Sequence, residues 1–279
     1  MTRPLTGGDL LLVATKTLTD AGVPDAARDA RRLFVYASGV EAWRLTLSLP
    51  EPVTPEVQKR FELLVARRAT REPVSHLIGT REFYGRTFEV TPDVLDPRPE
   101  TETLVEVALR GHFSRVLDLG TGSGCILVTL LAEMTGAVGV GGDRSPAALA
   151  VALRNAQRHG VDDRATFVQS DWMSAIRQPF DLIVSNPPYI AAHEMPDLAP
   201  DVQKWEPRLA LTDEGDGLSA YRSIIDQALP ALMPGGTLIF EIGPTQGAAV
   251  ARMMHAVDLR NVSVIPDLDG RDRVVMGQM

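Results

Sequence analysis

The feature that most constrains the fold is an apolar run at 180–185 that leads directly into Asn186, Pro187, Pro188 and Tyr189. Such a run is typical of a strand buried in a parallel sheet, and ligands of open α/β sheets bind just beyond the carboxyl ends of strands. The prolines stiffen the turn, so its carbonyls and the Asn186 amide oxygen can face one point. Two such acceptors suit a planar NH2 group, on which Tyr189 can stack. The alternative is a proline-rich turn without chemistry.

A glycine-rich turn follows an earlier short strand at 116–119 and precedes a predicted helix at 125–134. A turn of this kind lets the backbone approach a ligand closely and offers the N–H groups of a helix start. Its spacing is not that of the dinucleotide fingerprint, because the third glycine comes one position early. The residues of the turn are Gly120, Thr121, Gly122, Ser123 and Gly124.

Asp143 ends the next predicted strand, which begins at Val138. It lies 23 positions beyond Gly120, close to the ~20 typical of a carboxylate that accepts hydrogen bonds from ribose hydroxyls. A further strand at 165–170 ends in Asp171 and Trp172, an acid and an indole that suit an adenine base. A strand-end acid beside a core aromatic is also common without any ligand, but three strand ends here face one crevice. The pattern therefore predicts a cofactor that contains a nucleoside, and nothing in the turn demands a pyrophosphate.

These motifs, in this order, resemble the class I S-adenosylmethionine-dependent methyltransferases that act on planar nitrogens. More closely, the chain is similar to the protein-(glutamine-N5) methyltransferases of the PrmC/HemK family. The resemblance is strong from about residue 70 onward and covers the earlier part only in its helical character. It rests on the stretches 72–79, 81–85, 97–102, 118–124, 155–156, 171–172, 186–190 and 206–211. The block at 97–102 matters most, because Asn-Pro-Pro-Tyr alone is shared with DNA adenine methyltransferases.

The resemblance implies methylation of the glutamine in the Gly-Gly-Gln loop of bacterial class-1 peptide-chain release factors. It implies S-adenosylmethionine as cofactor and a class I doubly wound α/β sheet with an antiparallel last strand. The implied catalytic residues are Asn186, Pro187 and Tyr189. The implied cofactor-binding residues are Gly120, Thr121, Gly122, Ser123, Gly124, Asp143, Asp171, Trp172 and Asn186. The implied substrate-binding residues are Asn186, Pro187, Pro188, Tyr189, Arg98 and Glu100.

Two places depart from the pattern of that family. Asp96 stands before Pro97, where the family usually has an apolar residue, and Gly141 and Gly142 replace larger residues before Asp143. The first departure is expected to alter the loop beside the substrate. The second is expected to loosen the end of the strand. Neither touches Asn186.

The chemistry expected of Asn186 follows from the weak nucleophilicity of an amide nitrogen. Two acceptors for its N–H bonds, the Asn186 side chain and the Pro187 carbonyl, would push electron density back onto nitrogen during an in-line methyl transfer. No strong general base is needed. Glu100 and Glu241 are candidates for favouring the sulfonium charge, with a salt-bridged or solvated role as the alternative for each.

The charge distribution bears on the substrate class. Residues 1–75 carry a net charge of +2 and the remainder carries −10, within a chain of 279 residues. Methyltransferases of nucleic acids usually present basic residues to phosphates, so an acidic catalytic part argues against DNA. Methylation of an amino group of adenine or guanine in nucleic acid remains the alternative function. A non-catalytic module with a relic cofactor fold is a second one, disfavoured because every strand end retains usable residues.

Other composition features point to a soluble intracellular enzyme, which is expected to be a cytoplasmic monomer. The apolar run at 126–132 is too short to span a bilayer, and residues 1–9 lack a secretory pattern. The single cysteine, Cys125, permits no internal disulfide, and the five histidines lack ligand spacing. No metal and no membrane or direct nucleic-acid partner is expected.

The chain is expected to divide into an N-terminal helical substrate-docking domain at 1–82, a strand-like hairpin linker at 83–99 and a catalytic domain at 100–279. Three helices are predicted in the first part, after Thr6, after Pro24 and after Thr54. A basic cluster of Arg67, Arg68 and Arg71 ends the third helix. It is expected to interact favourably with the helix dipole. Contact with an acidic partner is the more specific alternative. A helix at 218–232 and a strand at 237–242 are predicted near the end of the catalytic part.

Overall fold

The computed structural model describes residues 4–279 and divides them into two compact units. The helical unit comprises the chain up to Gly79 together with Pro200–Trp205, and the sheet unit comprises Thr80–Ala199 and Glu206–Met279. This division differs from the predicted one. The hairpin of β1 (Thr80–Phe83) and β2 (Arg86–Glu89) belongs to the sheet unit, and a short segment from late in the chain belongs to the helical unit.

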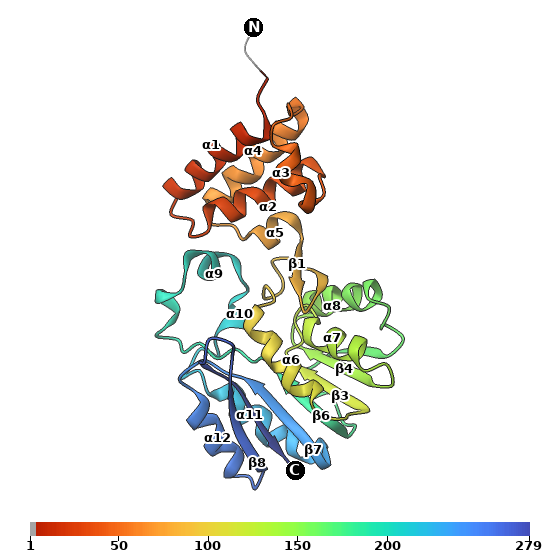
Figure 1. Ribbon diagram of the computed structural model, residues 1–279. Coiled ribbons are helices and arrows are strands. Elements are labelled where there is room, and N and C mark those ends of the chain that lie inside the picture. Colours follow the sequence, from red (N-terminus) through yellow and green to blue (C-terminus); the bar gives the residue numbers. More distant parts are fainter. Residues whose placement is uncertain (1–3) are drawn as a thin grey trace. The chain divides into compact units, whose positions relative to one another are not determined.

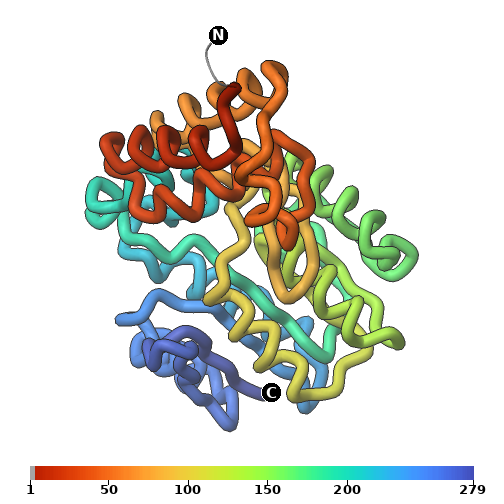
Figure 2. The backbone as a smooth tube through the Cα atoms, turned by 45° about the horizontal axis from the view of Figure 1, so that its top comes forward, coloured from red at the N-terminus to blue at the C-terminus, as the bar shows by residue number. Residues whose placement is uncertain are grey.

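The helical unit is built around α1 (Gly7–Asp20), α2 (Ala26–Ser38) and α4 (Pro55–Ala69), which pack on one another in Figures 1 and 2. Thr6 caps α1 in a reciprocal arrangement with Asp9, as its position before the apolar repeat predicts. Phe34 and Phe61 meet edge to face at the centre, with ring centroids 5.4 Å apart. The shorter elements are η1 (Ala42–Arg44), α3 (Leu45–Ser48), α5 (Val74–Ile78) and α9 (Pro200–Trp205).

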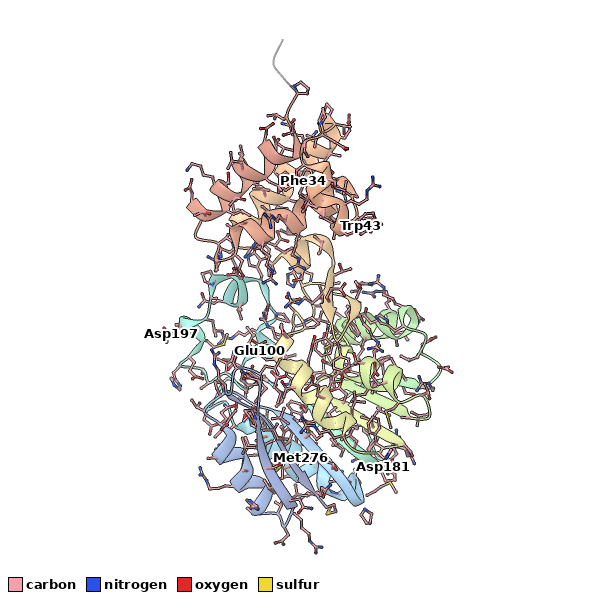
Figure 3. The ribbon with its side chains drawn as sticks, in the orientation of Figure 1. Phe34, Trp43, Glu100, Asp181, Asp197 and Met276 are labelled. Atoms are coloured by element: carbon pink, nitrogen blue, oxygen red, sulfur yellow. The ribbon has the colours of Figure 1, made fainter. Side chains whose placement is uncertain are left out.

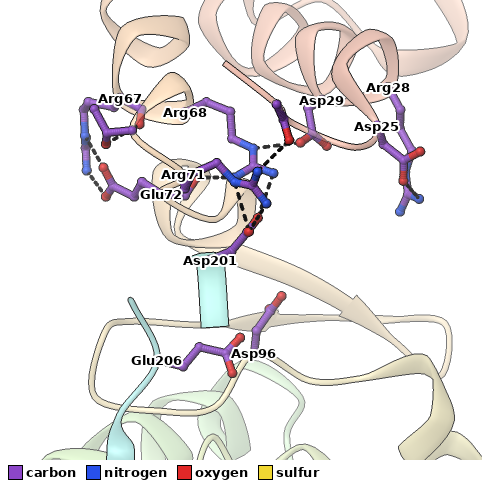
Figure 4. Close-up of polar contacts among 12 residues, drawn as sticks. Asp25, Arg28, Asp29, Arg67, Arg68, Arg71, Glu72, Asp96, Asp201 and Glu206 are labelled. Atoms are coloured by element: carbon purple, nitrogen blue, oxygen red, sulfur yellow. Dashed lines mark hydrogen bonds and ion pairs between the residues drawn. The ribbon is translucent and has the colours of Figure 1, made fainter. Parts of the chain in front are cut away.

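The predicted basic cluster at the end of α4 forms an internal ion-pair network. Arg67 and Arg68 lie in the last turn of the helix, where interaction with the helix dipole is expected, and contact with an acidic partner protein stays a prediction. Arg68 is buried, and its guanidinium donates to Asp29 of α2 at 2.8 Å and to Asp201 of α9 at 3.0 Å. Arg71 also pairs with Asp201, while Arg67 pairs with Glu72 (Figure 4). The acidic partners belong to the chain itself, because a buried guanidinium must be compensated within the fold.

Asp201 explains why α9 belongs to the helical unit, although it lies 130 residues from Arg71 and 133 residues from Arg68 in sequence. Burial alone would raise the pKa of Asp201, but hydrogen bonds from Arg71 and Arg68 bring this pKa below its ordinary value of 3.8. The stabilisation is therefore present above about pH 4 and is lost as the pH falls through the lower pKa of the folded state.

The sheet unit contains seven strands in the order β5-β4-β3-β6-β7-β9-β8. All neighbours from β5 to β7 are parallel, and β9 runs antiparallel between β7 and β8, which confirms the predicted antiparallel last strand. The strands are β3 (Arg115–Leu119), β4 (Val138–Asp143), β5 (Ala165–Gln169), β6 (Phe180–Ser185), β7 (Leu232–Glu241), β8 (Arg260–Pro266) and β9 (Asp272–Gln278).

Helices cover both faces of this sheet (Figure 1). Successive residues of the central strands alternate between two apolar clusters: Val116 belongs to the cluster that contains residues of α6 and α7, and Leu117 to the cluster that contains residues of α11 and α12. The doubly wound α/β class is thereby confirmed. The helices are α6 (Glu102–Leu109), α7 (Cys125–Glu133), α8 (Pro146–Arg158), α10 (Arg208–Leu211), α11 (Ser219–Ala228) and α12 (Gly247–His255), with short helices η2 (Pro99–Thr101), η3 (Met195–Asp197) and η4 (Leu229–Ala231).

Two local predictions in the sheet unit need correction. The predicted helix at 218–232 is shorter, because η4 follows α11 and β7 already begins at Leu232, which pairs with Phe180. The expected loosening of β4 is also wrong. Phe167 and Ile176 fill the space beside Gly141 and Gly142, where an added Cβ would lie 2.9 Å and 3.0 Å from their side chains, and both glycines are paired with β3 and β5.

Asp201→Asn tests the ion-pair network of the helical unit. The substitution removes the charge that compensates Arg68 and Arg71, so we expect the opening free energy of α9 and α2 to fall by about 1–3 kcal/mol. Hydrogen exchange of the backbone amides of these two helices measures this. Asp25→Asn is the matched control, because the Asp25–Arg28 pair is exposed, at 67% and 66% of the side chains, and Asp25 makes no side-chain cap. Equal protection in both variants would contradict the role of the network.

Candidate functional site

A cavity of about 340 Å³ lies at the carboxyl ends of β3, β4, β5 and β6, where the strand order reverses between β3 and β6. Reversal of the connection directions leaves a crevice at this point of a doubly wound sheet. We call it the strand-end cavity, and all of its lining residues belong to the sheet unit. Of the predicted site residues, it is lined by Arg98, Gly120, Thr121, Gly122, Ser123, Asp143, Trp172, Asn186 and Pro188.

The glycine-rich turn forms one wall of the cavity. Gly120 and Gly122 have φ values of +73° and +54°, a conformation that favours glycine and lets the chain turn tightly between β3 and α7. Gly124 caps α7 from outside the cavity, where an added Cβ would lie 3.0 Å from the Cβ of Ala152. The sequence thus predicts the turn, but not that its last glycine serves helix packing.

Asp143 is held rigidly at the end of β4. Its two carboxylate oxygens accept from the backbone N–H groups of Gly122 and Ser145, each at 2.9 Å. Each oxygen keeps a lone pair for a further donor. The carboxylate therefore faces the cavity in a fixed orientation.

Asp118 of β3 lies beneath the turn and is completely buried. Its Oδ2 accepts from the Thr121 hydroxyl at 2.7 Å, and burial raises its pKa to about 7. The bond fixes the Thr121 side chain of the turn. The motif shows Asp118 in the sequence, but its burial depends on the strands on either side.

Trp172 and Asp171, which follow β5, lie in different environments. Trp172 lines the cavity, and its ring lies 3.8 Å from the position of a Cβ at Gly120. Asp171 is exposed, lies 3.7 Å from Arg144, and is not among the lining residues. The structure therefore places the indole, and not the neighbouring acid, at the cavity wall.

Asn186 and Pro188 line the cavity at the end of β6, whereas Pro187 is buried and Tyr189 half-buried outside its wall. The Asn186 Nδ2 donates to the Thr101 hydroxyl at 3.4 Å. The Tyr189 carbonyl accepts from the Gln246 side chain at 2.9 Å, which pins the turn. Burial raises the pKa of the Tyr189 hydroxyl, so this ring stays neutral.

Arg98 reaches the cavity from the loop before η2. Its Nη2 donates to both carboxylate oxygens of the buried Glu206, at 2.6 Å and 2.8 Å. The pair joins two stretches that the sequence motifs mark separately. Glu100 is exposed and does not line the cavity. Sequence reasoning gave no role to Thr101 or to the wall formed by residues 207–223, although the motif at 206–211 marks the start of that wall.

Asp96 is buried beside this loop. It lies 3.6 Å from Arg81, which also donates to the Pro97 carbonyl at 3.0 Å. The carboxylate introduced at Asp96 is therefore compensated by the guanidinium of Arg81. Arg81 also holds the loop that carries Arg98, through its hydrogen bond to the Pro97 carbonyl.

Within residues 4–279, no group of three or more histidine, cysteine, aspartate or glutamate residues could hold a metal ion. None of the helices described is long and apolar enough to cross a membrane.

Comparison with known proteins gives the same outline over nearly the whole chain. Residues 9–79 match the PrmC N-terminal domain, and residues 95–202 match the methyltransferase small domain. A release factor glutamine methyltransferase of Cereibacter sphaeroides is 55% identical over 97% of this chain and 98% of that protein. A protein of the same name from Rhodospirillum rubrum is 43% identical over 97% of this chain and 84% of its own length.

The chain belongs to the release factor glutamine methyltransferase family.

Solved structures with low identity support the methyltransferase fold alone. A methyltransferase from Pyrococcus furiosus is similar with a TM-score of 0.55 and 16% identity, over 76% of this chain and 98% of that one. The hMettl16 catalytic domain, in complex with the MAT2A 3'UTR hairpin 6, has a TM-score of 0.58 and 18% identity, over 77% and 81%.

Proposed function

We propose that this chain transfers a methyl group from S-adenosylmethionine to the side-chain amide nitrogen (N5) of the glutamine in the Gly-Gly-Gln motif of bacterial class-1 peptide-chain release factors. The observation that carries the proposal is the turn at 186–189, whose Asn186 and Pro188 line the strand-end cavity together with residues 120–123 of the glycine-rich turn. Near full-length similarity to release factor glutamine methyltransferases supports the choice of substrate.

The cofactor half of the cavity fits a nucleoside. The Asp143 carboxylate, oriented by two backbone N–H groups, has lone pairs left for both ribose hydroxyls. The Trp172 ring provides an apolar face for the adenine, and the turn from Gly120 to Ser123 provides close backbone approach. Gly124 and Asp171 act indirectly in this account, through the start of α7 and the strand-end turn. Bound S-adenosylmethionine supplies the sulfonium methyl group.

The reacting half of the cavity holds the glutamine amide. The Asn186 Oδ1 and the Pro187 carbonyl accept hydrogen bonds from the two N–H groups of the amide. These hydrogen bonds favour withdrawal of the nitrogen lone pair from amide resonance as the nitrogen becomes tetrahedral. Tyr189 supports the plane of the amide, Pro188 stiffens the turn, and Arg98 with the neighbouring Glu100 borders the entry for the loop. The methylated nitrogen then loses its proton without a strong base, because a cationic amide is strongly acidic.

The helical unit is the proposed docking surface for the release factor. Of the thirteen exposed large apolar residues in the described chain, seven lie in this unit, although it is much the smaller of the two. Trp43 is 77% exposed and Leu47 is 72% exposed, one helical turn apart on η1 and α3. Figure 3 shows Trp43 at the surface of the unit, in contrast to Phe34 among the helices. Exposed tryptophan is typical of the centre of protein interfaces.

The proposed enzyme acts as a monomer. Its proposed location is the cytoplasm, because its substrate works on cytoplasmic ribosomes. Methylation of nucleic acid is not favoured. The RNA-bound neighbour shares only the fold, and the chain after Ser75 carries a net charge of −10.

The decisive experiment is incubation of intact release factor with the enzyme and S-adenosylmethionine, followed by peptide mass spectrometry. A mass gain of one methyl group on the Gly-Gly-Gln glutamine is expected. Methylated adenine in a nucleic-acid control, with unmodified release factor, would overturn the proposal.

Asn186→Ala and Asp143→Ala should fail in different ways. Loss of the Asn186 acceptor should slow single-turnover methyl transfer by ~10²–10³-fold, by analogy with the loss of one oxyanion-hole donor, with little change in cofactor affinity. Loss of the Asp143 carboxylate should weaken S-adenosylmethionine binding by ~1.5–3 kcal/mol, as for hydrogen bonds to a charged group. Single-turnover kinetics and calorimetry separate the two. A wild-type rate for Asn186→Ala, or unchanged affinity for Asp143→Ala, would remove that residue from its role.

Trp43→Ala should raise the KM for intact release factor by about tenfold or more, since truncation of an interface anchor typically costs over 1 kcal/mol. Cofactor affinity and the rate at saturating release factor should stay unchanged. Leu153→Ala is the control, because Leu153 is an exposed apolar residue of the sheet unit. If both variants have the KM of the wild type, Trp43 is not part of the docking surface.

A further inference from the structure

The side chain of Gln246, the residue before α12, lies against the end of the turn that follows β6. Its Nε2 donates to the Tyr189 carbonyl at 2.9 Å and to the Gly217 carbonyl at 3.1 Å. Its Oε1 accepts from the Gly243 N–H at 3.0 Å and from the Tyr221 hydroxyl at 3.2 Å. A glutamine amide has two N–H donors and two acceptor lone pairs, so every position of this amide is used.

These contacts fix the direction in which the Gln246 amide points. With its oxygen and nitrogen exchanged, Oε1 would face the Tyr189 and Gly217 carbonyl oxygens, and Nε2 would face the N–H of Gly243. Neither arrangement allows a hydrogen bond, because acceptor would meet acceptor and donor would meet donor. The buried Tyr221 hydroxyl has one proton, which it shares between Gln246 and the main-chain carbonyl of the last residue of β7. Both N–H groups of Gln246 therefore hold main-chain carbonyls.

The main chain at Gly217 lies directly against the carbonyl that Gln246 holds. An added Cβ at Gly217 would overlap the Tyr189 carbonyl oxygen and would lie 3.1 Å from the Gln246 Nε2. The φ of Gly217 is +75°, a conformation that favours glycine. The space and the backbone conformation thus both require a glycine at this position.

The loop that contains Gly217 forms part of the wall of the strand-end cavity. We call residues 213–219 the wall loop, and Asp213 and Ser219, at its two ends, line the cavity. The Asp213 carboxylate accepts from the N–H groups of Gly217 and Ser219, at 3.0 Å and 2.9 Å. The wall loop therefore has hydrogen bonds of its own, and Gln246 joins it to the turn.

We propose that Gln246 is a positioning residue for the methyl transfer, which clamps the turn at 186–189 to the wall loop and so fixes the acceptors of the turn. This inference rests on the proposed amide methylation. The carbonyl that Gln246 holds belongs to the same short turn as Asn186 and Pro187, the two proposed acceptors. A reaction that depends on orientation can lose ~10²-fold in rate when its groups are misplaced by about 1 Å.

The clamp should act on the rate and not on cofactor binding. Gln246 is not among the residues that line the cavity, so it acts through the main chain of the turn. The Asp143 carboxylate is held by the N–H groups of Gly122 and Ser145, independently of Gln246. The wall loop keeps its hydrogen bonds to Asp213 when Gln246 is replaced.

Gln246→Met tests the proposal in the full-length enzyme with intact release factor. It keeps the length of the side chain and removes all of its hydrogen bonds. Single-turnover transfer at saturating release factor should slow by about ten- to a hundredfold, as expected for a small displacement of the acceptors. The KM for release factor and the calorimetric affinity for S-adenosylhomocysteine should stay at the wild-type values.

Gln278→Met is the matched control, with the wild-type rate expected. The Gln278 side chain accepts a hydrogen bond from Asn261 at 2.8 Å, and Gln278 pairs with Thr237, away from the carboxyl end of β7. If Gln246→Met fails to bind S-adenosylhomocysteine, Gln246→Glu replaces it. The glutamate keeps an acceptor for the Gly243 N–H and loses both donors, so the same slowing is expected.

Gly217→Ala displaces the Tyr189 carbonyl from the other side and should also slow the transfer. Combined with Gln246→Met, the loss of rate should be smaller than the product of the two single losses, because both substitutions move the same peptide. Wild-type rates in the Gln246 variants would overturn the inference, as would fully multiplicative losses or a loss of cofactor affinity equal to the loss of rate. Wild-type enzyme that does not methylate release factor would instead overturn the proposed function, and this inference with it.

Discussion

The reversal of strand order between β3 and β6 is the constraint on which the site depends. From β3, the chain adds β4 and β5 on one side in the sheet, and then β6 and β7 on the other side. Parallel strands have their carboxyl ends at the same end of the sheet. The turn after β3, Asp143, Trp172 and Asn186 therefore meet around one cavity. The turn after β3, Asp143 and Asn186 follow strands that are largely buried, whereas Trp172 follows the partly exposed edge strand β5. Orientation, the main resource of a methyl transfer without a strong base, is thus built into the sheet.

A second constraint acts through the covalent connections of the chain. The segment that follows the Asn186 turn leaves the sheet unit at Ala199, contributes α9 to the helical unit, and returns at Glu206. Near the start of this segment, Asp201 forms ion pairs with Arg68 and Arg71. Where the chain returns to the sheet unit, Glu206 forms an ion pair with Arg98. Charged pairs therefore fix both ends of the segment, each within its own unit. The chain that follows the turn at 186–189 is also the chain that completes the proposed docking unit.

The sequence permits prediction of what is local or periodic. The strand at 180–185 matches β6 at both ends, and the glycine-rich turn, Asp143 and Trp172 lie where their strand-end positions indicate. Long-range pairing was not predictable in the same way. Arg68 and Asp201 are 133 residues apart, so the arginine cluster resembled a free basic patch. Gly141 and Gly142 suggested a loose strand because Phe167 and Ile176, which fill their space, carry no sequence sign of doing so.

A crystal structure with bound S-adenosylhomocysteine and a glutamine-containing ligand would test the central claim most directly. The account predicts the ribose hydroxyls on the Asp143 carboxylate, and the glutamine amide nitrogen about 3 Å from the Asn186 Oδ1 and from the Pro187 carbonyl. A ribose bound away from Asp143, or a glutamine amide whose nitrogen faces neither acceptor, would contradict it.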